Sequence, residues 1–140
     1  MSMTLDQIIK SSLPLRKANA RLVKVVAYKT GRDKQGLATA VAKTYTPQEY
    51  NMQRKLVSAR DQNKYVSSIK FLDKKLHVKV SCSCPDFVFA GWEWSLHERG
   101  AADIVYGNGE PPNEKNPSYL PGCCKHLIAL RALVKGKHGI

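Results

Sequence analysis

Residues 65–84 read YVSSIKFLDKKLHVKVSCSC and predict a β-hairpin that ends in two cysteines. Two runs with strand character, 65–72 and 76–82, flank a short polar turn, which is a hairpin signal. In the second run apolar and polar residues alternate, and the same period of two places Cys82 and Cys84 on the apolar face. We therefore expect the two thiols to extend the core side of the hairpin.

A predicted helix near the end of the sequence begins at a second segment that contains cysteine. Residues 125–134 carry apolar side chains at helical spacing, and Gly136 is placed to end the helix. The segment Cys124-Lys125-His126 stands at its start. A strand end and a helix start can converge on one point. Because a helix N-terminus favours negative charge, Cys124 should lose its proton more easily there.

These two segments together offer donors for one metal ion: Cys82, Cys84, Cys124 and His126. Soft sulfur donors with one imidazole nitrogen suit tetrahedral Zn²⁺, which makes no redox demand. Four protein ligands fill the coordination shell and leave no position for water. We therefore expect a structural zinc ion rather than a catalytic one.

The two ligand segments resemble the SWIM zinc-finger family, in which a C-x-C pair and a C-x-H pair lie on a ββα unit. The matching residues are Cys82-Ser83-Cys84-Pro85-Asp86-Phe87 and Cys124-Lys125-His126-Leu127-Ile128-Ala129-Leu130. The resemblance implies that the hairpin and the last helix form this unit around zinc, with the same four ligands. It covers residues 65–134, and SWIM-like proteins of this compact size occur among phage proteins.

Two further residues offer alternative ligands. Cys123 lies beside Cys124, although only Cys124 has the C-x-H spacing to His126, and His97 could replace the nitrogen donor. The four cysteines could instead form two disulfides or remain simple buried thiols. Adjacent cysteines are poorly placed to bond each other, and no export signal opens the sequence, which argues against disulfides.

The remaining segments predict short helices and one more hairpin, so the expected fold class is α+β. Thr4 and Gln7 have capping-box spacing for a helix that stops before Pro14. The other expected elements are a hairpin of strands at 22–29 and 38–45, a helix at 46–60 that begins with the capping pair Thr46 and Glu49, a helix at 86–99, and an irregular loop at 106–122. We expect two β-hairpins with short helices, of which the second hairpin and the last helix form a ββα unit held together by zinc.

The positive charge lies entirely in the first 81 residues. The net charge is +12, with 17 Lys and Arg against 5 Asp and Glu up to Ser81 and 6 against 6 after it. We divide the chain into a basic N-terminal region, 1–64, and a zinc-binding unit, 65–140, with a long insertion at 85–123. The bias favours an acidic protein or nucleic acid as partner, unless the charges only solvate a surface. The candidate contact residues are Arg16, Lys17, Arg21, Lys24, Arg32 and Lys34.

These features predict a non-enzymatic, zinc-stabilised interaction protein that is a subunit of a larger assembly such as a phage particle. The alternative is a nucleic-acid-binding accessory or regulatory protein that contacts DNA or RNA. No combination of nucleophile, base and orienting residue is legible from the spacing, so we expect no enzyme. No apolar run is long enough to span a membrane and no secretory signal is legible. We therefore expect a virion or cytoplasmic location and no membrane partner.

Overall fold

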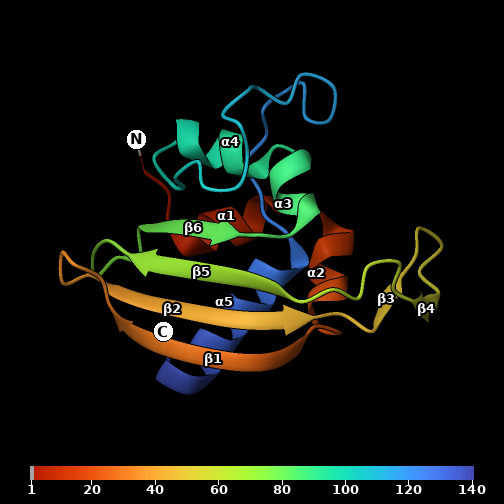
Figure 1. Ribbon diagram of the computed structural model, residues 1–140, viewed down its shortest axis with the longest axis horizontal. Coiled ribbons are helices and arrows are strands. Elements are labelled where there is room, and N and C mark those ends of the chain that lie inside the picture. Colours follow the sequence, from red (N-terminus) through yellow and green to blue (C-terminus); the bar gives the residue numbers. More distant parts are fainter. Residues whose placement is uncertain (1) are drawn as a thin grey trace.

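The computed structural model describes residues 2–140 and confirms the expected α+β class (Figure 1). None of the helices within this range has the length and apolar character that crossing a membrane requires. In chain order the elements are α1 (Leu5–Ser11), α2 (Pro14–Ala20), β1 (Lys24–Arg32), β2 (Ala38–Tyr45), β3 (Gln48–Tyr50), β4 (Leu56–Ser58), β5 (Tyr65–Phe71), β6 (Val78–Cys82), α3 (Pro85–Phe89), α4 (Trp92–Glu98) and α5 (Lys125–His138).

Four strands form one antiparallel sheet in the order β1-β2-β5-β6 (Figure 1). Both hairpins predicted from the sequence are confirmed, β1 with β2 and β5 with β6. The first strand begins at Lys24 and continues through Gly31 to Arg32, and the last begins at Val78. Because β2 also pairs with β5, the sheet continues across residue 64.

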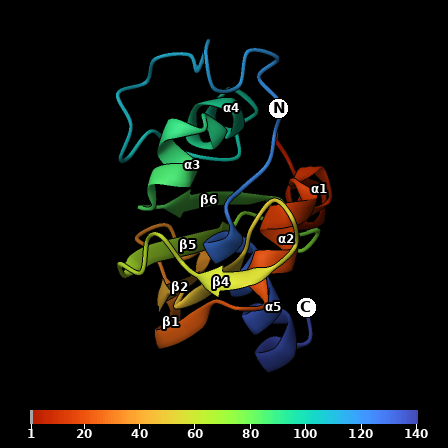
Figure 2. The same ribbon diagram turned by 90° about the vertical axis from the view of Figure 1, so that its right-hand side faces the viewer.

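Helices cover one face of this sheet and leave the other face open (Figure 2). α5 contacts β2, β5 and β6, and α2 contacts α5. α3 contacts β6, and α3 and α4 lie beyond that edge strand (Figures 1 and 2). The last strand, the short helices that follow it and the start of α5 therefore meet at one corner of the fold.

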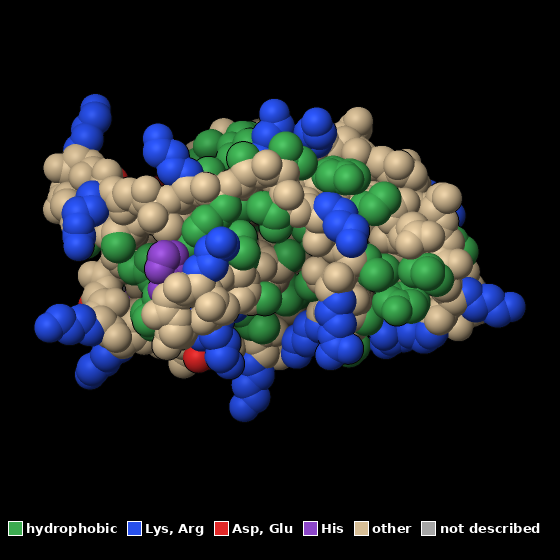
Figure 3. Space-filling model, turned by 90° about the horizontal axis from the view of Figure 1, so that it is seen from below, with side chains coloured by type: hydrophobic (Ala, Val, Ile, Leu, Met, Phe, Trp, Pro, Cys, Tyr) green, Lys and Arg blue, Asp and Glu red, His purple; other side chains and the backbone are tan. Residues whose placement is uncertain are grey.

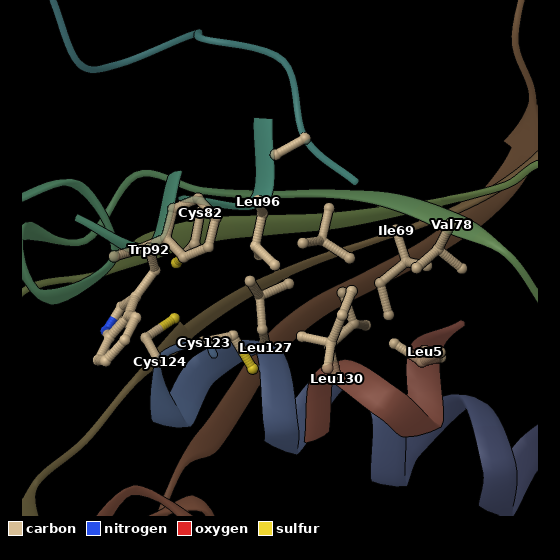
Figure 4. Packing of buried hydrophobic residues seen from close by; sticks show 14 of the residues in the cluster. Leu5, Ile69, Val78, Cys82, Trp92, Leu96, Cys123, Cys124, Leu127 and Leu130 are labelled. Atoms are coloured by element: carbon tan, nitrogen blue, oxygen red, sulfur yellow. The ribbon is translucent and has the colours of Figure 1, made fainter. Parts of the chain in front are cut away.

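The core lies between α5 and the covered face of the sheet. Ala42, Ile69 and Val80, on three neighbouring strands, are at most 3% exposed. Leu127 and Leu130 of α5 face these strands (Figure 4). Strand alternation with a period of two directs every second side chain of β2, β5 and β6 inward, so the same alternation that buries the aliphatic side chains also buries Cys82.

The two edges of the sheet differ. At β6, the Val78 N–H donates to the Met3 carbonyl at 3.1 Å and the Val80 N–H donates to the Ala101 carbonyl at 2.9 Å, so neighbouring segments cover this edge. β1 pairs only with β2 among the described residues. Every residue of β1 except Tyr28 is exposed. One edge strand of nine residues therefore faces solvent, with its outer main-chain groups unpaired by any other strand.

The helix expected at 46–60 is wrong, because this segment forms the two-stranded sheet of β3 and β4. Asn51 Oδ1 accepts two backbone hydrogen bonds, each of 3.0 Å, from the turn between the strands. Asn19 of α2 binds both main-chain groups of Tyr50, as acceptor at 2.6 Å and as donor at 3.2 Å. The bonds from Asn19 hold the segment extended. They could not be predicted from Thr46 and Glu49, because a capping pair reports only on residues close in sequence.

The bounds of two later helices also differ from those expected, and in both cases a glycine is responsible. The helix expected at 86–99 is divided into α3 and α4 at Gly91, which has φ of 85°. A Cβ there would lie 2.3 Å from Pro112, so the close approach of the following loop also requires glycine. The last helix does not end at Gly136 but continues to His138, and Gly139, with φ of 70°, is its C-cap.

A candidate metal centre

Cys82, Cys84, Cys124 and His126 come together in one buried cluster. Their ligand atoms, one from each residue, all lie within 4.8 Å of one another. The three cysteines are at most 1% exposed and the histidine is 4% exposed. This cluster could hold a metal ion, since all four donors reach one point and solvent does not compete for them.

Three elements carry the donors to this point. Cys82 ends β6, and Cys84, two residues later, is the N-cap of α3 with Pro85 at the first helical position. The Phe87 N–H donates to Cys84 Sγ at 3.4 Å. Cys124 is the N-cap of α5, and His126 lies in the first turn of that helix. Figure 4 shows Cys124 directed towards Cys82.

His126 provides an independent observation that fits a metal. Its Nδ1 is buried and has no hydrogen-bond partner in the described part of the chain. The ring of Tyr65 packs edge-on against the imidazole, with 5.4 Å between ring centroids. A buried nitrogen without a partner costs about 1–3 kcal/mol, and coordination through this nitrogen would remove that cost.

The thiols of the cluster differ in pKa, because each one hydrogen-bonds to the others and all are buried. Hydrogen bonding from Cys124, followed by that from Cys82, lowers the pKa of Cys84 well below its usual range. Burial raises the pKa of Cys124 well above its usual range and so outweighs the helix N-terminus, which was expected to make this thiol lose its proton more easily. One sulfur is thus stabilised as a thiolate by neighbours that keep their protons. A bound cation would replace those protons, because metal ligands of this kind bind as thiolates.

The two alternative ligands lie outside the cluster. Cys123 Sγ is 3.4 Å from Ser12 Oγ, and the Cys123 N–H donates to the same hydroxyl at 3.1 Å. Burial raises the pKa of Cys123 to about 12, so it is a protonated core thiol. Figure 4 shows Cys123 directed away from Cys82. His97 is exposed, with its ring 3.4 Å from Glu98. All four cysteines are free, so no disulfide joins them.

Arg16, expected to contact an anionic partner, instead binds a residue next to the cluster. Its guanidinium donates to both carboxylate oxygens of Asp86, at 2.7 and 3.2 Å. This hydrogen bonding, with a smaller contribution from the nearby sulfurs of Cys124 and Cys84, raises the pKa of Arg16. The pair fastens α2 to α3 beside the sulfur atoms. Sequence analysis missed it, because 70 residues separate the partners and neither is a candidate metal ligand.

A cavity of about 590 Å³ adjoins the cluster between α2, β3, β4 and the start of α5. Arg16, Lys125 and His126 contribute to its lining, and Lys125 Nζ lies 3.8 Å from Glu49. Positive groups therefore lie on the solvent side of the cluster. Asp86 and Glu49 line the same cavity and pair with Arg16 and Lys125, so each of these two cations is matched by a carboxylate beside the cluster.

The other predicted contact residues do not gather into one site. Lys17 donates to the Lys10 carbonyl at 3.2 Å, whereas Arg21 is exposed just after α2. Lys24 and Arg32 are exposed at opposite ends of β1, a distance of about 25 Å for eight strand steps. Exposed Lys34 lies in the turn that follows. The positive charge is therefore distributed over α2, β1 and the adjoining turn.

Comparisons of the chain with protein-family models, with curated proteins and with solved structures gave no match. The resemblance to SWIM zinc fingers rests on the two ligand segments themselves. What the structure adds to it is the cluster of Cys82, Cys84, Cys124 and His126, carried by the end of a strand and the start of a helix.

Proposed function

We propose that this chain is a non-enzymatic interaction protein, held together by Zn²⁺ in its C-terminal half, whose basic surface docks onto an acidic partner within a larger assembly. A phage particle is one such assembly, and the support for it is the resemblance stated above. The single observation that carries the zinc role is the buried cluster of three thiols and one imidazole within 4.8 Å. Such a set favours Zn²⁺ over harder cations, which prefer oxygen ligands.

A structural role for the ion follows from the donors. Four protein ligands complete a tetrahedron, so a bound zinc would have no open position for water or substrate. Structural zinc of this kind contributes on the order of 10 kcal/mol of apparent folding free energy. The ion would join β6, α3 and α5, whose buried residues Cys82, Phe87 and Leu127 already belong to one hydrophobic core.

Native mass spectrometry tests the zinc role directly. The intact chain purified without added metal should carry the mass of one zinc ion, and a chelator should remove it together with part of the thermal stability. Elemental analysis of the same sample identifies the metal. A chain that is fully folded, with no bound metal and no change on chelation, would contradict the proposal.

Binding to anionic probes tests the docking role. The exposed basic residues of α2, β1 and the following turn support an acidic protein or a nucleic acid as partner. Poly-glutamate and duplex DNA of matched charge density should be titrated with the zinc-loaded protein over a salt series. We expect poly-glutamate to bind, with affinity falling as salt rises. Tighter DNA binding with a steep salt slope would favour the nucleic-acid accessory role instead.

A further inference from the structure

The edge of β1 carries an unusual combination of open main-chain groups and an adjoining apolar cavity. The Asp33 N–H donates to the Leu37 carbonyl at 3.0 Å and closes the β1–β2 hairpin. Hydrogen-bonded and non-hydrogen-bonded pairs alternate along an antiparallel ladder. The pairs Arg32↔Ala38, Thr30↔Ala40 and Tyr28↔Ala42 are therefore of the second kind. The N–H and C=O groups of Tyr28, Thr30 and Arg32 consequently point away from β2, towards solvent.

A cavity of about 440 Å³ lies directly beside these outward groups. Tyr28 and Thr30 of β1 form one wall, and Phe71, Val134 and Ile140 supply apolar surface on the others. The strand side chains that face α5 point into this space. An additional strand placed on β1 would therefore direct the side chain opposite Thr30 towards apolar surroundings.

The rim of this face is positively charged. Lys29 and Lys43 project from the open face of the sheet, since they alternate with the residues that face α5. On the α5 side, Lys137 Nζ lies 5.8 Å from the centre of the Tyr28 ring. Figure 3, which looks onto this side, shows apolar side chains at the centre and Lys and Arg around them, with few acidic groups in view.

We infer that β1 accepts an additional antiparallel strand from a partner protein, in which acidic residues alternate with apolar ones. The main-chain groups of Tyr28, Thr30 and Arg32 would bind that strand, and its apolar side chains would enter the cavity. Its acidic side chains would face Lys29 and Lys43. This inference rests on the proposed docking role and specifies the chemistry of the partner.

Charge selects this occupant over a second copy of the chain. Strand β1 carries Lys24, Lys29 and Arg32 and no acidic residue, so two β1 strands that paired with each other would bring like charges together, which destabilises a sheet. An acidic strand reverses the sign of that interaction. A nucleic acid would satisfy the lysines but would leave the outward N–H and C=O groups and the apolar cavity without matching partners.

Peptide binding measured by fluorescence anisotropy tests the inference on the zinc-loaded protein. The probe is a labelled peptide in which glutamate alternates with valine. Its control has the same composition, with all glutamates before all valines. We expect the alternating peptide to bind at least about tenfold more tightly, which corresponds to about 1.4 kcal/mol. Amide NMR shifts should be largest at Tyr28, Thr30 and Arg32.

Two variants separate strand addition from charge attraction. Thr30→Pro removes an outward N–H without breaking the β2 ladder and should weaken the alternating peptide at least about tenfold. Lys29→Glu should weaken it several-fold, whereas Lys115→Glu, the same charge change in the loop beyond α4, should not. Circular dichroism and zinc content verify that each variant is folded. If Thr30→Pro does not fold, the comparison of the two peptides still tests strand addition, and the comparison of the two lysine variants still tests the charge contribution.

Three outcomes would overturn strand addition. In the first, both peptides bind equally and poly-glutamate binds as well, so that docking by charge stands while strand addition fails. In the second, only duplex DNA binds. In the third, the protein is a dimer that the peptide cannot dissociate. Loss of binding to every anionic probe would remove the proposed docking role together with the inference, while the zinc measurement remains independent of both.

Discussion

Two neighbouring cysteines have different surroundings, and this difference is visible at single atoms. Cys124 is directed into the cluster with Cys82, whereas Cys123 contacts Ser12 on the opposite side of the chain. Both are at most 1% exposed, so burial alone does not distinguish them. The direction of the side chain does, because successive residues in an extended segment point to opposite sides.

Cys124→Ser should therefore abolish stoichiometric metal binding, while Cys123→Ser should retain it. A hydroxyl is a poor ligand for a soft-donor site, and the remaining donors would leave it incomplete. At position 123 a hydroxyl can still bond to Ser12, so the loss of stability should be only about 1–2 kcal/mol. Elemental analysis and thermal denaturation check both variants. Loss of metal from Cys123→Ser with retention in Cys124→Ser would reverse the assignment.

Glu93 is a buried carboxylate that organises the loop after α4. It is 2% exposed and accepts hydrogen bonds from the backbone N–H groups of Val105, Tyr106 and Gly107, at 3.3, 3.1 and 2.8 Å. Three donors converge on two oxygen atoms, so the charge is compensated within the protein. Sequence analysis did not identify this role, because the partners lie in an irregular segment without a repeating pattern.

Glu93→Gln should destabilise the fold by about 1–3 kcal/mol. The amide replaces one acceptor oxygen with an NH₂ group, which leaves at least one loop N–H facing a donor. Glu98→Gln makes the same chemical change at an exposed carboxylate and should have little effect. Urea denaturation of both variants gives the comparison. Equal stability of the two would show that the loop bonds contribute nothing.

At the scale of elements, the turn of the first hairpin depends on one aspartate. Asp33 Oδ1 accepts from the Leu37 and Gln35 N–H groups, each at 2.9 Å, and Oδ2 lies 3.0 Å from Lys70 Nζ. The hydrogen bond from Leu37, followed by the interaction with Lys70, lowers the pKa of Asp33. The ionised carboxylate therefore stabilises the folded hairpin above the pKa of the unfolded chain, and this contribution is lost as pH falls through the folded pKa.

Asp33→Asn should accordingly be less stable than the natural sequence near neutral pH, and the difference should shrink in acid below the pKa of the folded state. Denaturant unfolding at several pH values measures this difference. Asp103→Asn, which removes a mostly exposed carboxylate bound to Lys79, should give a much smaller pH-dependent difference. A stability difference for Asp33→Asn that grows as pH falls would contradict the sign of the shift.

Two glycines in or beside helices should respond to alanine in opposite directions. Gly91 has φ of 85°, and a Cβ would approach Pro112 to 2.3 Å, so Gly91→Ala should cost more than about 2 kcal/mol. Gly136 lies inside α5 with nothing within 4 Å of an added Cβ, so Gly136→Ala should stabilise the protein by about 0.5–1 kcal/mol. Thermal denaturation distinguishes them. Destabilisation by Gly136→Ala would imply that α5 is not continuous there.

The elements that sequence analysis predicted correctly are those with strong local patterns. Alternation and turn residues identify both hairpins, and the Thr4–Gln7 capping box is present, with its two hydrogen bonds at 2.9 and 3.2 Å. The helix expected at 46–60 failed because contacts with Asn19 override the local propensity. The helix α2 was missed because Pro14 suggested a stop, although proline also begins helices.

At the scale of the whole molecule, the residues that form the candidate metal cluster could be predicted and their surroundings could not. The spacing of two short segments identifies Cys82, Cys84, Cys124 and His126. The Arg16–Asp86 pair, the adjoining cavity and the open β1 edge depend on which elements lie side by side. That arrangement follows from packing in three dimensions, which one sequence does not encode as a periodic pattern.

Removal of the metal should loosen one corner of the molecule before the rest. Chelation should lower the unfolding midpoint by more than about 10 °C, given an ion that contributes on the order of 10 kcal/mol. Hydrogen exchange should increase first in α3, α4 and the first turn of α5. The β1–β2 hairpin should lose protection last. The Cys124→Ser variant should reproduce this pattern without chelator, and a uniform increase over all strands would contradict it.

The long insertion between the two ligand pairs has a consequence for protein engineering. Cys84 and Cys124 fix the two ends of residues 85–123 at one point, and much of the outer part, from Asp103 to Leu120, is exposed. A bound ion would thus anchor both stems independently of what lies between them. The exposed residues 108–111, between the backbone groups that Glu93 binds and Pro112, are therefore where a foreign epitope or reporter could be grafted with the least disturbance to folding.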